Sequence, residues 1–513
     1  MLNTPLRDQQ VLVLGLGESG LAMARWCARA GAQVSVWDSR EAPPQLAALR
    51  EQVPSARVLS GALDASSLHG VQLLLKSPGL GPKDDRIAPA LEWARQTGVP
   101  VAGELDLFGQ ALEALRVERD YAPQVLAVTG TNGKTTTTAM TALLVERAGR
   151  SVVAAGNIGP TMLDTLTRLL DDATALPQVW VLELSSFQLD GVRGFEPAAA
   201  VVLNLTQDHL DWHGDMAAYG EAKARIFGAR AVAVLNRDDA AVEAMAAALV
   251  APRPSKARAP KPVPRVVVRF GLDAPHSPGD FGLIQENGIG WLVRAMPEEE
   301  GLKRKKDEAP EIHLQRLMPA DALRVRGRHN AANALAALAL ATAIGCPLAP
   351  MLHGLREYAG EPHRVQPVGR LGEVEAFDDS KGTNVGATVA ALLGLGADRA
   401  PSRLVVILGG DGKGQDFSPL VEPMQRHARA AALIGRDAPA IAAALAATGV
   451  TLQHLADLPK AVRWCFEQAQ PGDAVLLSPA CASLDMFRHY GHRAEVFVQA
   501  VHELAAERGE ILS

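Results

Sequence analysis

The stretch Thr129-Gly-Thr-Asn-Gly-Lys-Thr-Thr136 decides the fold of this 513-residue chain. Its first residue, Thr129, is the last of an apolar run, Gln124-Val-Leu-Ala-Val-Thr129, and a helical pattern follows the stretch. This is the context of a phosphate-binding loop. Backbone N–H groups of such a turn and the N-terminus of the helix form a cradle for phosphates. We expect Lys134 to reach the β- and γ-phosphates and the Thr135 hydroxyl to face Mg²⁺. Position 128 holds valine where the strict pattern has glycine, so a chance Gly-Lys-Thr in a turn is the alternative.

Acidic, imidazole and amine side chains follow the neighbouring apolar runs. Strands are predicted at Val179–Leu184, Ala199–Leu205 and Ala231–Leu235. Glu183 lies at the end of the first, where a carboxylate commonly holds Mg²⁺ beside a phosphate loop, although a plain strand-end residue is the alternative. His209 follows the second strand. A structural role and contact with a metal or phosphate are the two alternatives for this histidine. Lys223 lies on a predicted helix and, taken alone, is typical of a surface lysine.

A second glycine-rich turn lies near the N-terminus. Val11-Leu-Val-Leu14 precedes Gly15-Leu-Gly-Glu-Ser-Gly20, and Asp38 follows the predicted strand Val34–Trp37. This spacing matches the dinucleotide fingerprint, whose glycines admit a pyrophosphate close to the backbone. The fingerprint serves NAD or any nucleotide diphosphate, so an NAD-dependent dehydrogenase is the rival hypothesis. That rival leaves the second phosphate loop unexplained. Further strands at Leu73–Lys76 and Val99–Ala102 indicate that the first domain ends near Gly103.

A tract of different character separates the central segment from a third α/β segment. Residues 252–265 carry five cationic residues and no acidic ones, and residues 298–308 form a mixed charged run. We expect solvated loops there, with a basic patch as the alternative. Val266–Phe270 and Phe281–Val293, the latter with an Asn287-Gly288 turn, are predicted to form β-hairpin structure. The third segment begins at about Glu361. Strands are predicted there at Val374–Phe377, Leu404–Leu408 and Ala474–Leu477, with helices between these strands.

Composition limits the classes of function. With 48% apolar and 21% charged residues, the chain is typical of a globular protein of about three domains. The formal charge of −6 and the 4% of aromatic residues give no basis for nucleic-acid binding. Four widely separated cysteines exclude a disulfide scaffold and a zinc ribbon and favour a reducing compartment. The chain shows no signal-peptide layout and no apolar stretch of membrane-spanning length, and Ala334–Ile344 is predicted to be a buried helix. We therefore expect a cytoplasmic protein with no membrane contact.

Taken together, these motifs resemble those of the Mur ligase family from Gly15 to about Tyr490. Three segments are similar to the branch that adds D-glutamate: Asp378-Asp-Ser-Lys-Gly-Thr-Asn384, Leu408-Gly-Gly-Asp-Gly-Lys413 and Leu477-Ser-Pro-Ala-Cys-Ala-Ser-Leu-Asp485. The resemblance implies an ATP-dependent amide ligase that adds D-glutamate to UDP-N-acetylmuramoyl-L-alanine through an acyl phosphate. This reaction belongs to cytoplasmic peptidoglycan precursor synthesis, and so to cell-wall biogenesis, cell shape and cell division.

The same resemblance implies three α/β domains. We expect a Rossmann-like UDP-binding domain at residues 1–103, a central P-loop ATPase domain with a parallel sheet at 104–360, and a Rossmann-like domain for the amino acid at 361–513. Residues 251–310 have no clear counterpart in the family and are expected to be an insertion.

Roles are carried onto individual positions by the resemblance. The UDP substrate is expected to contact Glu18, Ser19, Asp38, Ser39, Arg40, Gly79 and Asn157. ATP is expected at Gly130, Thr131, Asn132, Gly133, Lys134, Thr135, Thr136, Asn330, Asn333, Arg364 and Asp379. D-Glutamate is expected at Lys381, Thr383, Ser483, Leu484 and Tyr490. The expected catalytic residues are Lys134, Glu183, His209, Lys223 and Lys413.

The resemblance also implies two Mg²⁺ ions, with ATP as co-substrate. One ion is expected at Thr135 and Glu183, and the second at His209 and Lys223, a lysine that CO₂ carbamylates in this family. We expect a monomer in which the third domain closes over the nucleotide and completes the site. A degenerate ligase that binds nucleotide without turnover is the remaining alternative, and the intact catalytic set argues against it.

Overall fold

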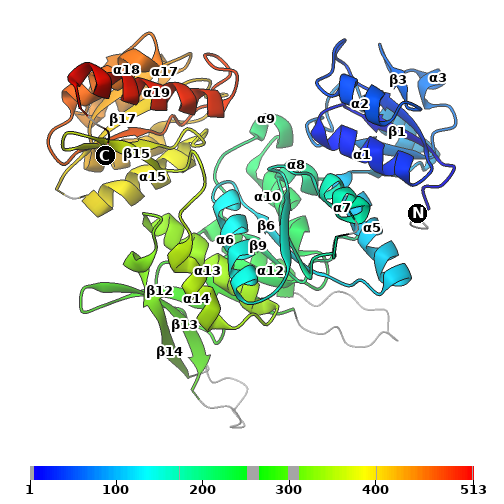
Figure 1. Ribbon diagram of the computed structural model, residues 1–513, viewed down its shortest axis with the longest axis horizontal. Helices are drawn as coiled ribbons and strands as arrows, with labels where there is room; N and C mark the ends of the chain where they lie inside the picture. The colour runs from blue at the N-terminus through cyan, green and yellow to red at the C-terminus, as the bar shows by residue number, and fades with distance from the viewer. Residues whose placement is uncertain are drawn as a thin grey trace.

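The computed structural model describes residues 5–172, 174–250, 265–298, 311–399, 401–510 and 512. Within these ranges the strands form three separate sheets, of five, nine and six strands. Figure 1 shows the corresponding lobes: the N-terminal lobe in blue and the C-terminal lobe in yellow to red both lie at one end of the central lobe. The expected three-domain α/β fold is confirmed. The three sheets lie within residues 10–102, 124–319 and 366–477, respectively.

The N-terminal sheet is parallel and has the order β3-β2-β1-β4-β5. Its strands are β1 (Gln10–Leu14), β2 (Gln33–Trp37), β3 (Arg57–Leu59), β4 (Leu73–Lys76) and β5 (Val101–Ala102). Its helices are α1 (Glu18–Arg29), α2 (Leu46–Gln52), α3 (Ala65–Leu68) and α4 (Ala88–Thr97). The turn between β1 and α1 is tight, because a Cβ on Gly20 would lie 2.0 Å from the Gly15 carbonyl oxygen. Only glycine fits there, as the fingerprint requires.

The central sheet has the order β14-β13-β12-β11-β10-β9-β6-β8-β7. Its strands are β6 (Gln124–Thr129), β7 (Val152–Gly156), β8 (Val179–Glu183), β9 (Ala199–Val202), β10 (Val232–Asn236), β11 (Val267–Phe270), β12 (Phe281–Glu286), β13 (Ile289–Pro297) and β14 (Ile312–Pro319). The associated helices are α5 (Glu104–Arg119), α6 (Lys134–Arg147), α7 (Met162–Asp171), α8 (Ser186–Leu189), α9 (Leu210–His213), α10 (Met216–Ala224), α11 (Ala240–Glu243), α12 (Met245–Val250), α13 (Arg328–Ala343) and α14 (Leu348–Glu357).

Two hydrophobic layers cover the central sheet. One face, with Ala127 and Trp180, shares a single apolar cluster with α5, α7 and helix α1 of the N-terminal domain. The other face packs against α6, α13 and α14. The alanine-rich run Ala334–Ile344 lies in α13 and its C-cap, and Ala334 to Ala341 are buried as expected. The shared cluster fixes the N-terminal lobe on the central lobe, and an Arg25–Asp164 ion pair of 2.7 Å joins α1 to α7.

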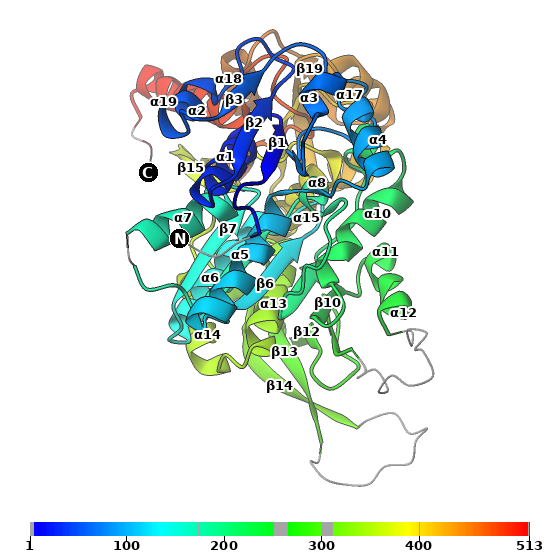
Figure 2. The same cartoon turned by 90° about the vertical axis from the view of Figure 1, so that its right-hand side faces the viewer.

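The sheet is parallel only in part, and the difference lies in residues 265–319. Strands β12 and β13 pair antiparallel through Asn287 and Gly288, whose φ angles of 53° and 78° give the tight turn that the sequence predicts. β13 then pairs antiparallel with β14, and Figure 2 shows this hairpin extending away from the other lobes. The hairpin prediction for Val266–Phe270 is wrong. Its residues 267–270 form β11, which pairs parallel with β10 because the segment continues the buried sheet.

The charged runs at 252–265 and 298–308 lie outside the described residues, apart from their end residues Arg265 and Glu298. Arg265 is not solvated as expected. Its guanidinium donates to the carbonyls of Phe227 at 2.9 Å and Gly228 at 2.8 Å. Between the two runs, Phe270, Phe281 and Leu292 are buried in the central core. Part of the expected insertion is therefore integral to the sheet.

The C-terminal sheet has the order β15-β16-β20-β17-β18-β19 and is parallel except for β15. Its strands are β15 (Gln366–Leu371), β16 (Val374–Asp378), β17 (Leu404–Gly409), β18 (Ala428–Ile434), β19 (Thr451–His454) and β20 (Ala474–Leu477). The helices are α15 (Val385–Arg399), α16 (Val421–His427), α17 (Ala438–Leu445), α18 (Leu458–Gln468) and α19 (Tyr490–Arg508). Among the described residues, no helix combines the length and the apolar character needed to cross a bilayer.

Candidate functional site

The phosphate loop joins β6 to α6 and is held rigidly against the end of β9. The Asn132 N–H donates to the Asn204 side-chain oxygen at 2.8 Å, and the Asn204 amide donates to the Asn132 carbonyl at 3.1 Å. Gly133 precedes the helix with a φ of 82°, and a Cβ there would lie 2.6 Å from Asn333 Oδ1. The left-handed φ favours glycine at this position, and a larger residue would require the Asn333 side chain to shift. The loop is thus held in one conformation at the N-terminus of α6, an arrangement that suits the binding of phosphates.

Two lysines converge on one carbonyl of this loop. Lys134 Nζ lies 2.9 Å from the Gly130 oxygen and 2.8 Å from that of Thr131. Lys223 Nζ lies 2.9 Å from the same Gly130 oxygen. Burial lowers the pKa of both lysines, and the charge of Lys134 lowers the pKa of Lys223 further. Lys223 is therefore buried beside the phosphate loop rather than a surface lysine, and Lys134 contacts two carbonyls of the same loop.

Glu183 at the end of β8 has the features of a magnesium ligand. Its side chain is buried, and its Oε1 accepts from the Asn157 amide at 3.0 Å. Its Oε2 is buried and has no hydrogen-bond partner among the described residues. A buried carboxylate oxygen without a partner is costly unless a ligand satisfies it. Together with the Thr135 hydroxyl, this oxygen gives the hard donors that Mg²⁺ prefers, so these residues fit the ion. Asn157 thus lies beside Glu183 at the end of β8.

His209 stands at the other side of the loop, at the N-cap of α9 with a φ of 55°. Its Nε2 lies 3.5 Å from Asp208 Oδ2, and its ring lies against Phe187. Burial lowers the pKa of His209, the Asp208 charge opposes this, and the charge of Lys413 adds to the lowering. The imidazole is therefore neutral near pH 7 and able to act as a ligand. Within the described ranges no three His, Cys, Asp or Glu side chains converge as a metal cluster.

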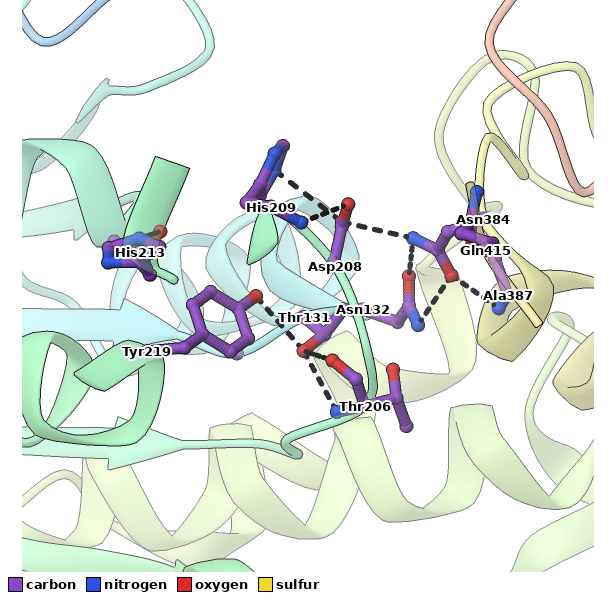
Figure 3. Close-up of polar contacts among 12 residues, drawn as sticks. Thr131, Asn132, Thr206, Asp208, His209, His213, Tyr219, Asn384, Ala387 and Gln415 are labelled. Atoms are coloured by element: carbon purple, nitrogen blue, oxygen red, sulfur yellow. Dashed lines mark hydrogen bonds and ion pairs between the residues drawn. The ribbon is translucent and has the colours of Figure 1, made fainter. Parts of the chain in front are cut away.

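Three residues beside this histidine were not predicted from the sequence. Figure 3 shows Asp208, Tyr219 and Asn384 around the phosphate loop. The Tyr219 hydroxyl lies 3.1 Å from Thr131 Oγ1, and its ring lies 4.6 Å from Lys223 Nζ. Asn384 and Asn132 exchange amide hydrogen bonds of 3.0 and 3.2 Å. Asn384 lies within a quoted motif and Asp208 directly precedes the predicted His209, which was the available signal, but the partners of Asn384, namely Asn132 and Asp208, come from other parts of the chain.

The C-terminal domain contacts the first turn of α6 directly. Arg364 donates to the Thr135 hydroxyl at 2.5 Å. A small cavity of about 80 Å³ lies between the two domains, with seven of the predicted ATP contacts in its wall: Asn132, Gly133, Thr136, Asn330, Asn333, Arg364 and Asp379. Burial raises the pKa of Asp379 to about 7, although the Ser478 hydroxyl donates to it at 2.7 Å. The cavity thus brings together residues from helix α13, the loop after Glu361 and the loop after β16.

The predicted glutamate contacts lie at the ends of β16 and β20. Lys381 Nζ lies 3.8 Å from the centroid of the Tyr490 ring, and burial lowers the pKa of Lys381 to about 8. Ser483 is buried, whereas Leu484 is 70% exposed. Arg493 is fully buried and joins both loops by hydrogen bonds to Ser380 and Cys481, a role that the sequence did not reveal. This cluster combines cationic and hydroxyl groups of the kind that binds carboxylates.

A separate cavity of about 540 Å³ lies at the glycine turn of the N-terminal domain. Six of the seven predicted UDP contacts line it, namely Glu18, Ser19, Asp38, Ser39, Arg40 and Gly79. Burial tends to raise the pKa of Asp38, but hydrogen bonds from Arg40 and the Leu16 N–H bring it down to about 2. The cavity therefore has an ionised carboxylate, a guanidinium and the N-terminus of α1, which suits a nucleoside diphosphate.

Similar proteins are found along the whole chain. Residues 9–103 match the Mur ligase MurD-like N-terminal domain, 128–258 the Mur ligase middle domain, and 363–481 the Mur ligase glutamate ligase domain. The chain is 62% identical over 506 residues to the UDP-N-acetylmuramoylalanine--D-glutamate ligase of Albidiferax ferrireducens, with 98% of each chain covered. It is 58% identical over 512 residues to the protein of that name from Burkholderia pseudomallei, again with 98% of each covered.

Solved structures with the same fold are more distant in sequence. The MurF ligase of Thermotoga maritima in complex with ADP has a TM-score of 0.58 at 16% identity, covering 99% of this chain and 98% of that one. The UDP-N-acetylmuramate-alanine ligase MurC of Thermotoga maritima has a TM-score of 0.53 at 19% identity, covering 96% and 99%. These likenesses support the three-domain architecture.

Proposed function

The chain belongs to the Mur ligase family, and from this premise we propose that it joins D-glutamate to UDP-N-acetylmuramoyl-L-alanine, using ATP, in peptidoglycan precursor synthesis. The identity of 62% over 98% of both chains supports the choice of D-glutamate within the family. The observation that carries the activity is the convergence of Lys134, Lys223 and the unpartnered Glu183 oxygen on one phosphate loop. A hydride-transfer enzyme needs no such loop.

The chemistry starts from a carboxylate, which is a poor electrophile toward an amine. Transfer of the γ-phosphoryl group to the carboxylate oxygen gives an acyl phosphate, whose phosphate then leaves when the amine attacks. Phosphoryl transfer depends on positioning and charge neutralisation. Lys134 and the loop N–H groups hold the phosphates, and Arg364 brings a second cation to Thr135 from the C-terminal domain. These cations overcome the repulsion between the carboxylate and the incoming phosphoryl group.

We assign one Mg²⁺ to Thr135 and Glu183 and a second to His209 and Lys223. Bound at these residues, Mg²⁺ would offset the negative charge of the phosphates and the carboxylate. The Glu183 Oε2 atom supports the first assignment, and the neutral imidazole of His209 supports the second. The protein supplies the rigid arrangement: Asn157 fixes Glu183, and Phe187 and Asp208 confine His209.

Carbamylation of Lys223 is part of this proposal. Burial lowers the pKa of Lys223 well below its usual value, which favours the neutral amine. The amine lone pair attacks the carbon of CO₂, an N–C bond forms, and one proton is released. The product is an anionic carbamate on a residue that is buried beside the phosphate loop. An anion there would balance the charge of Lys134 and provide oxygen ligands for the second ion.

D-Glutamate is proposed to bind in the C-terminal domain. Lys381, Thr383 and Ser483 would receive its carboxylates, with Tyr490 and Leu484 beside them, and Lys413 would lie near the acyl phosphate. The Lys381–Tyr490 contact and the buried Ser483 support this placement. Because the nucleotide site is shared by two domains, closure of the C-terminal domain would bring the amine to the acyl phosphate. We place the enzyme in the cytoplasm as a monomer, where ATP and UDP-sugars are available.

ADP release by the purified protein tests the proposal. It should require both UDP-N-acetylmuramoyl-L-alanine and D-glutamate, and L-glutamate, L-alanine and diamino acids should give no stimulation. Lys134→Met is expected to abolish ADP release, whereas Lys460→Met, an exposed lysine paired with Asp457 on α18, should leave it unchanged. ADP release that ignores D-glutamate would refute the proposal. A change in nicotinamide absorbance instead would favour the dehydrogenase, and nucleotide binding without turnover would indicate a degenerate ligase.

A further inference from the structure

A glutamate buried between the N-terminal and central domains has no part in the site described above. Glu104 is the first residue of α5, two residues after strand β5, and it is only 3% exposed. Its helix packs against α1 of the N-terminal domain and α7 of the central domain, and Figure 1 shows these three helices together. Glutamate is almost never fully buried unless it is paired, so the surroundings of this carboxyl group need an explanation.

The two oxygens of this carboxyl group differ in what they contact. Oε1 accepts from the Leu163 N–H, in the first turn of α7, at 3.0 Å. Oε2 is buried and makes no hydrogen bond of normal length and angle with any described residue, although the Ser19 and Thr161 hydroxyls are close enough to lower the pKa of the group. A buried carboxylate with an unpaired oxygen is costly, whereas the neutral acid has a proton that it can donate.

The surroundings of Glu104 place its change of charge in the physiological range. Burial raises the pKa of Glu104 to about 7, the Leu163 N–H opposes this rise, and the negative charge of Asp164 on α7 adds to it. The other charged groups on the surrounding elements are Glu18 and Arg25 of α1, Lys76 of β4, Asp106 of α5, and Asp190 and Arg193 after α8. Glu104 is therefore about half protonated at pH 7.

Ser19 connects this carboxyl group to the N-terminal cavity. It is the second residue of α1, and it lines the cavity together with Gly15 and Gly17 of the glycine turn. A glycine turn followed by a helix N-terminus is where the phosphates of a nucleoside diphosphate bind. A serine hydroxyl has one proton, so it cannot donate both to a diphosphate and to an ionised Glu104. When Glu104 is protonated, its own O–H can donate to Ser19 Oγ, and the serine proton is then available to the ligand.

We propose that Glu104 is a positioning residue for the UDP-linked substrate: its neutral acid donates a hydrogen bond to Ser19 Oγ, and Ser19 donates its own proton to the diphosphate. This Glu104–Ser19 relay makes binding of the substrate take up a proton at Glu104. An ionised Glu104 would instead accept the serine proton and place a negative charge near the diphosphate. The relay deepens the function proposed above and rests on it, because the N-terminal cavity must hold the UDP group.

Calorimetric titration of the full chain with UDP-N-acetylmuramoyl-L-alanine, without ATP, measures this linkage in the absence of turnover. The diphosphate of this ligand is a diester, so it does not titrate near pH 7. The wild type should bind the ligand about 10-fold more weakly at pH 8 than at pH 6, because about nine tenths of Glu104 is ionised at pH 8. Buffers of different ionisation enthalpy should show uptake of nearly one proton at pH 8 and of almost none at pH 6.

Variants separate the relay from a general effect of pH. Glu104→Gln keeps an acceptor for the Leu163 N–H and a donor for Ser19 but does not titrate, so its affinity should be the same at pH 6 and pH 8. Ser19→Ala removes the relay, so it should bind more weakly at pH 6 and lose most of the pH dependence. Glu113→Gln is the matched control and should keep the wild-type profile, since Glu113 is an exposed glutamate on the same helix that pairs with Arg116. Uridine, which lacks the diphosphate, should bind the wild type equally at both pH values.

The possible outcomes separate the relay from the proposed function. Wild-type affinity that is equal at pH 6 and pH 8 overturns the relay while leaving the ligase activity intact, and so does a pH dependence that persists in Glu104→Gln or in Ser19→Ala. Uridine binding with the same pH dependence also overturns it, because Glu104 would then act on the fold of the cavity. A wild-type chain that binds the UDP-linked substrate at neither pH refutes the proposed function and the relay with it. A pH dependence that is lost in both relay variants and kept in Glu113→Gln supports the relay.

Discussion

Replacing Arg493 by methionine is expected to loosen both loops that carry the proposed glutamate contacts. The Arg493 side chain is fully buried at the start of α19. Its guanidinium donates to Ser380 Oγ at 3.0 Å, to the Ser380 carbonyl at 2.7 Å and to the Cys481 carbonyl at 3.1 Å. Ser380 lies one residue before Lys381, and Cys481 two residues before Ser483. One side chain therefore joins the two loops from within the domain.

The size of the effect follows from these three bonds. A hydrogen bond to a charged donor contributes about 1.5–3 kcal/mol, and its removal leaves two buried carbonyls and a hydroxyl without this partner. Among the described residues no carboxylate is hydrogen-bonded to Arg493, so removal of this buried cation relieves part of the loss. The net destabilisation of the C-terminal domain should be about 3 kcal/mol, or about 150-fold in its folding equilibrium. The KM for D-glutamate should rise about 10-fold, because the loops lose their shared anchor.

Hydrogen exchange and steady-state kinetics measure the two consequences. Amides of residues 378–384 and 478–485 should exchange faster in Arg493→Met, and the KM for the UDP substrate should change less than about twofold. Arg508→Met is the control, since Arg508 is an exposed arginine on the same helix. Arg493→Lys, which keeps a buried donor, should lie between the two. Unchanged exchange in both loops, together with an unchanged KM for D-glutamate, would refute the reasoning.

Three further perturbations address the rest of the site. The pKa of Lys381 is lowered to about 8, so its side chain loses its positive charge as the pH rises through 8. D-Glutamate binding should therefore weaken above pH 8 in the wild type but not in Lys381→Arg. Identical pH profiles of binding in the two proteins would contradict this. Lys223→Ala should still bind ATP in a titration yet lose most turnover, and activity like that of the wild type would remove the carbamate from the mechanism. Asn384→Ala removes both side-chain hydrogen bonds to Asn132 and should weaken ATP binding about 10-fold, which corresponds to about 1–2 kcal/mol. The control is Asn236→Ala, which removes a side-chain hydrogen bond within the central domain and should leave ATP binding unchanged.

Local patterns in the sequence predicted the elements whose signals are strong. The strands at 124–129 and 474–477 agree residue for residue, and the Asn287-Gly288 turn forms the predicted hairpin. Strand β18 shows the opposite case. Its sequence Ala-Arg-Ala-Ala-Ala-Leu-Ile lies in a region where helices are expected, and alanine is the best helix former. The segment is nevertheless an interior strand between β17 and β19, because pairing and burial on both sides override its intrinsic preference.

The candidate site divides in the same way. The sequence alone determined the phosphate loop, the glycine turn after β1 and the residue types at the strand ends, since these depend on local spacing and on what a short turn permits. Only the tertiary structure decided which of them meet: Lys134 with Lys223 on the Gly130 carbonyl, Asn132 with Asn384, and Ser19 with Glu104. These partners are separated along the chain by other strands and helices. The order of strands in each sheet and the packing of the domains set their distances, and no local pattern contains that order.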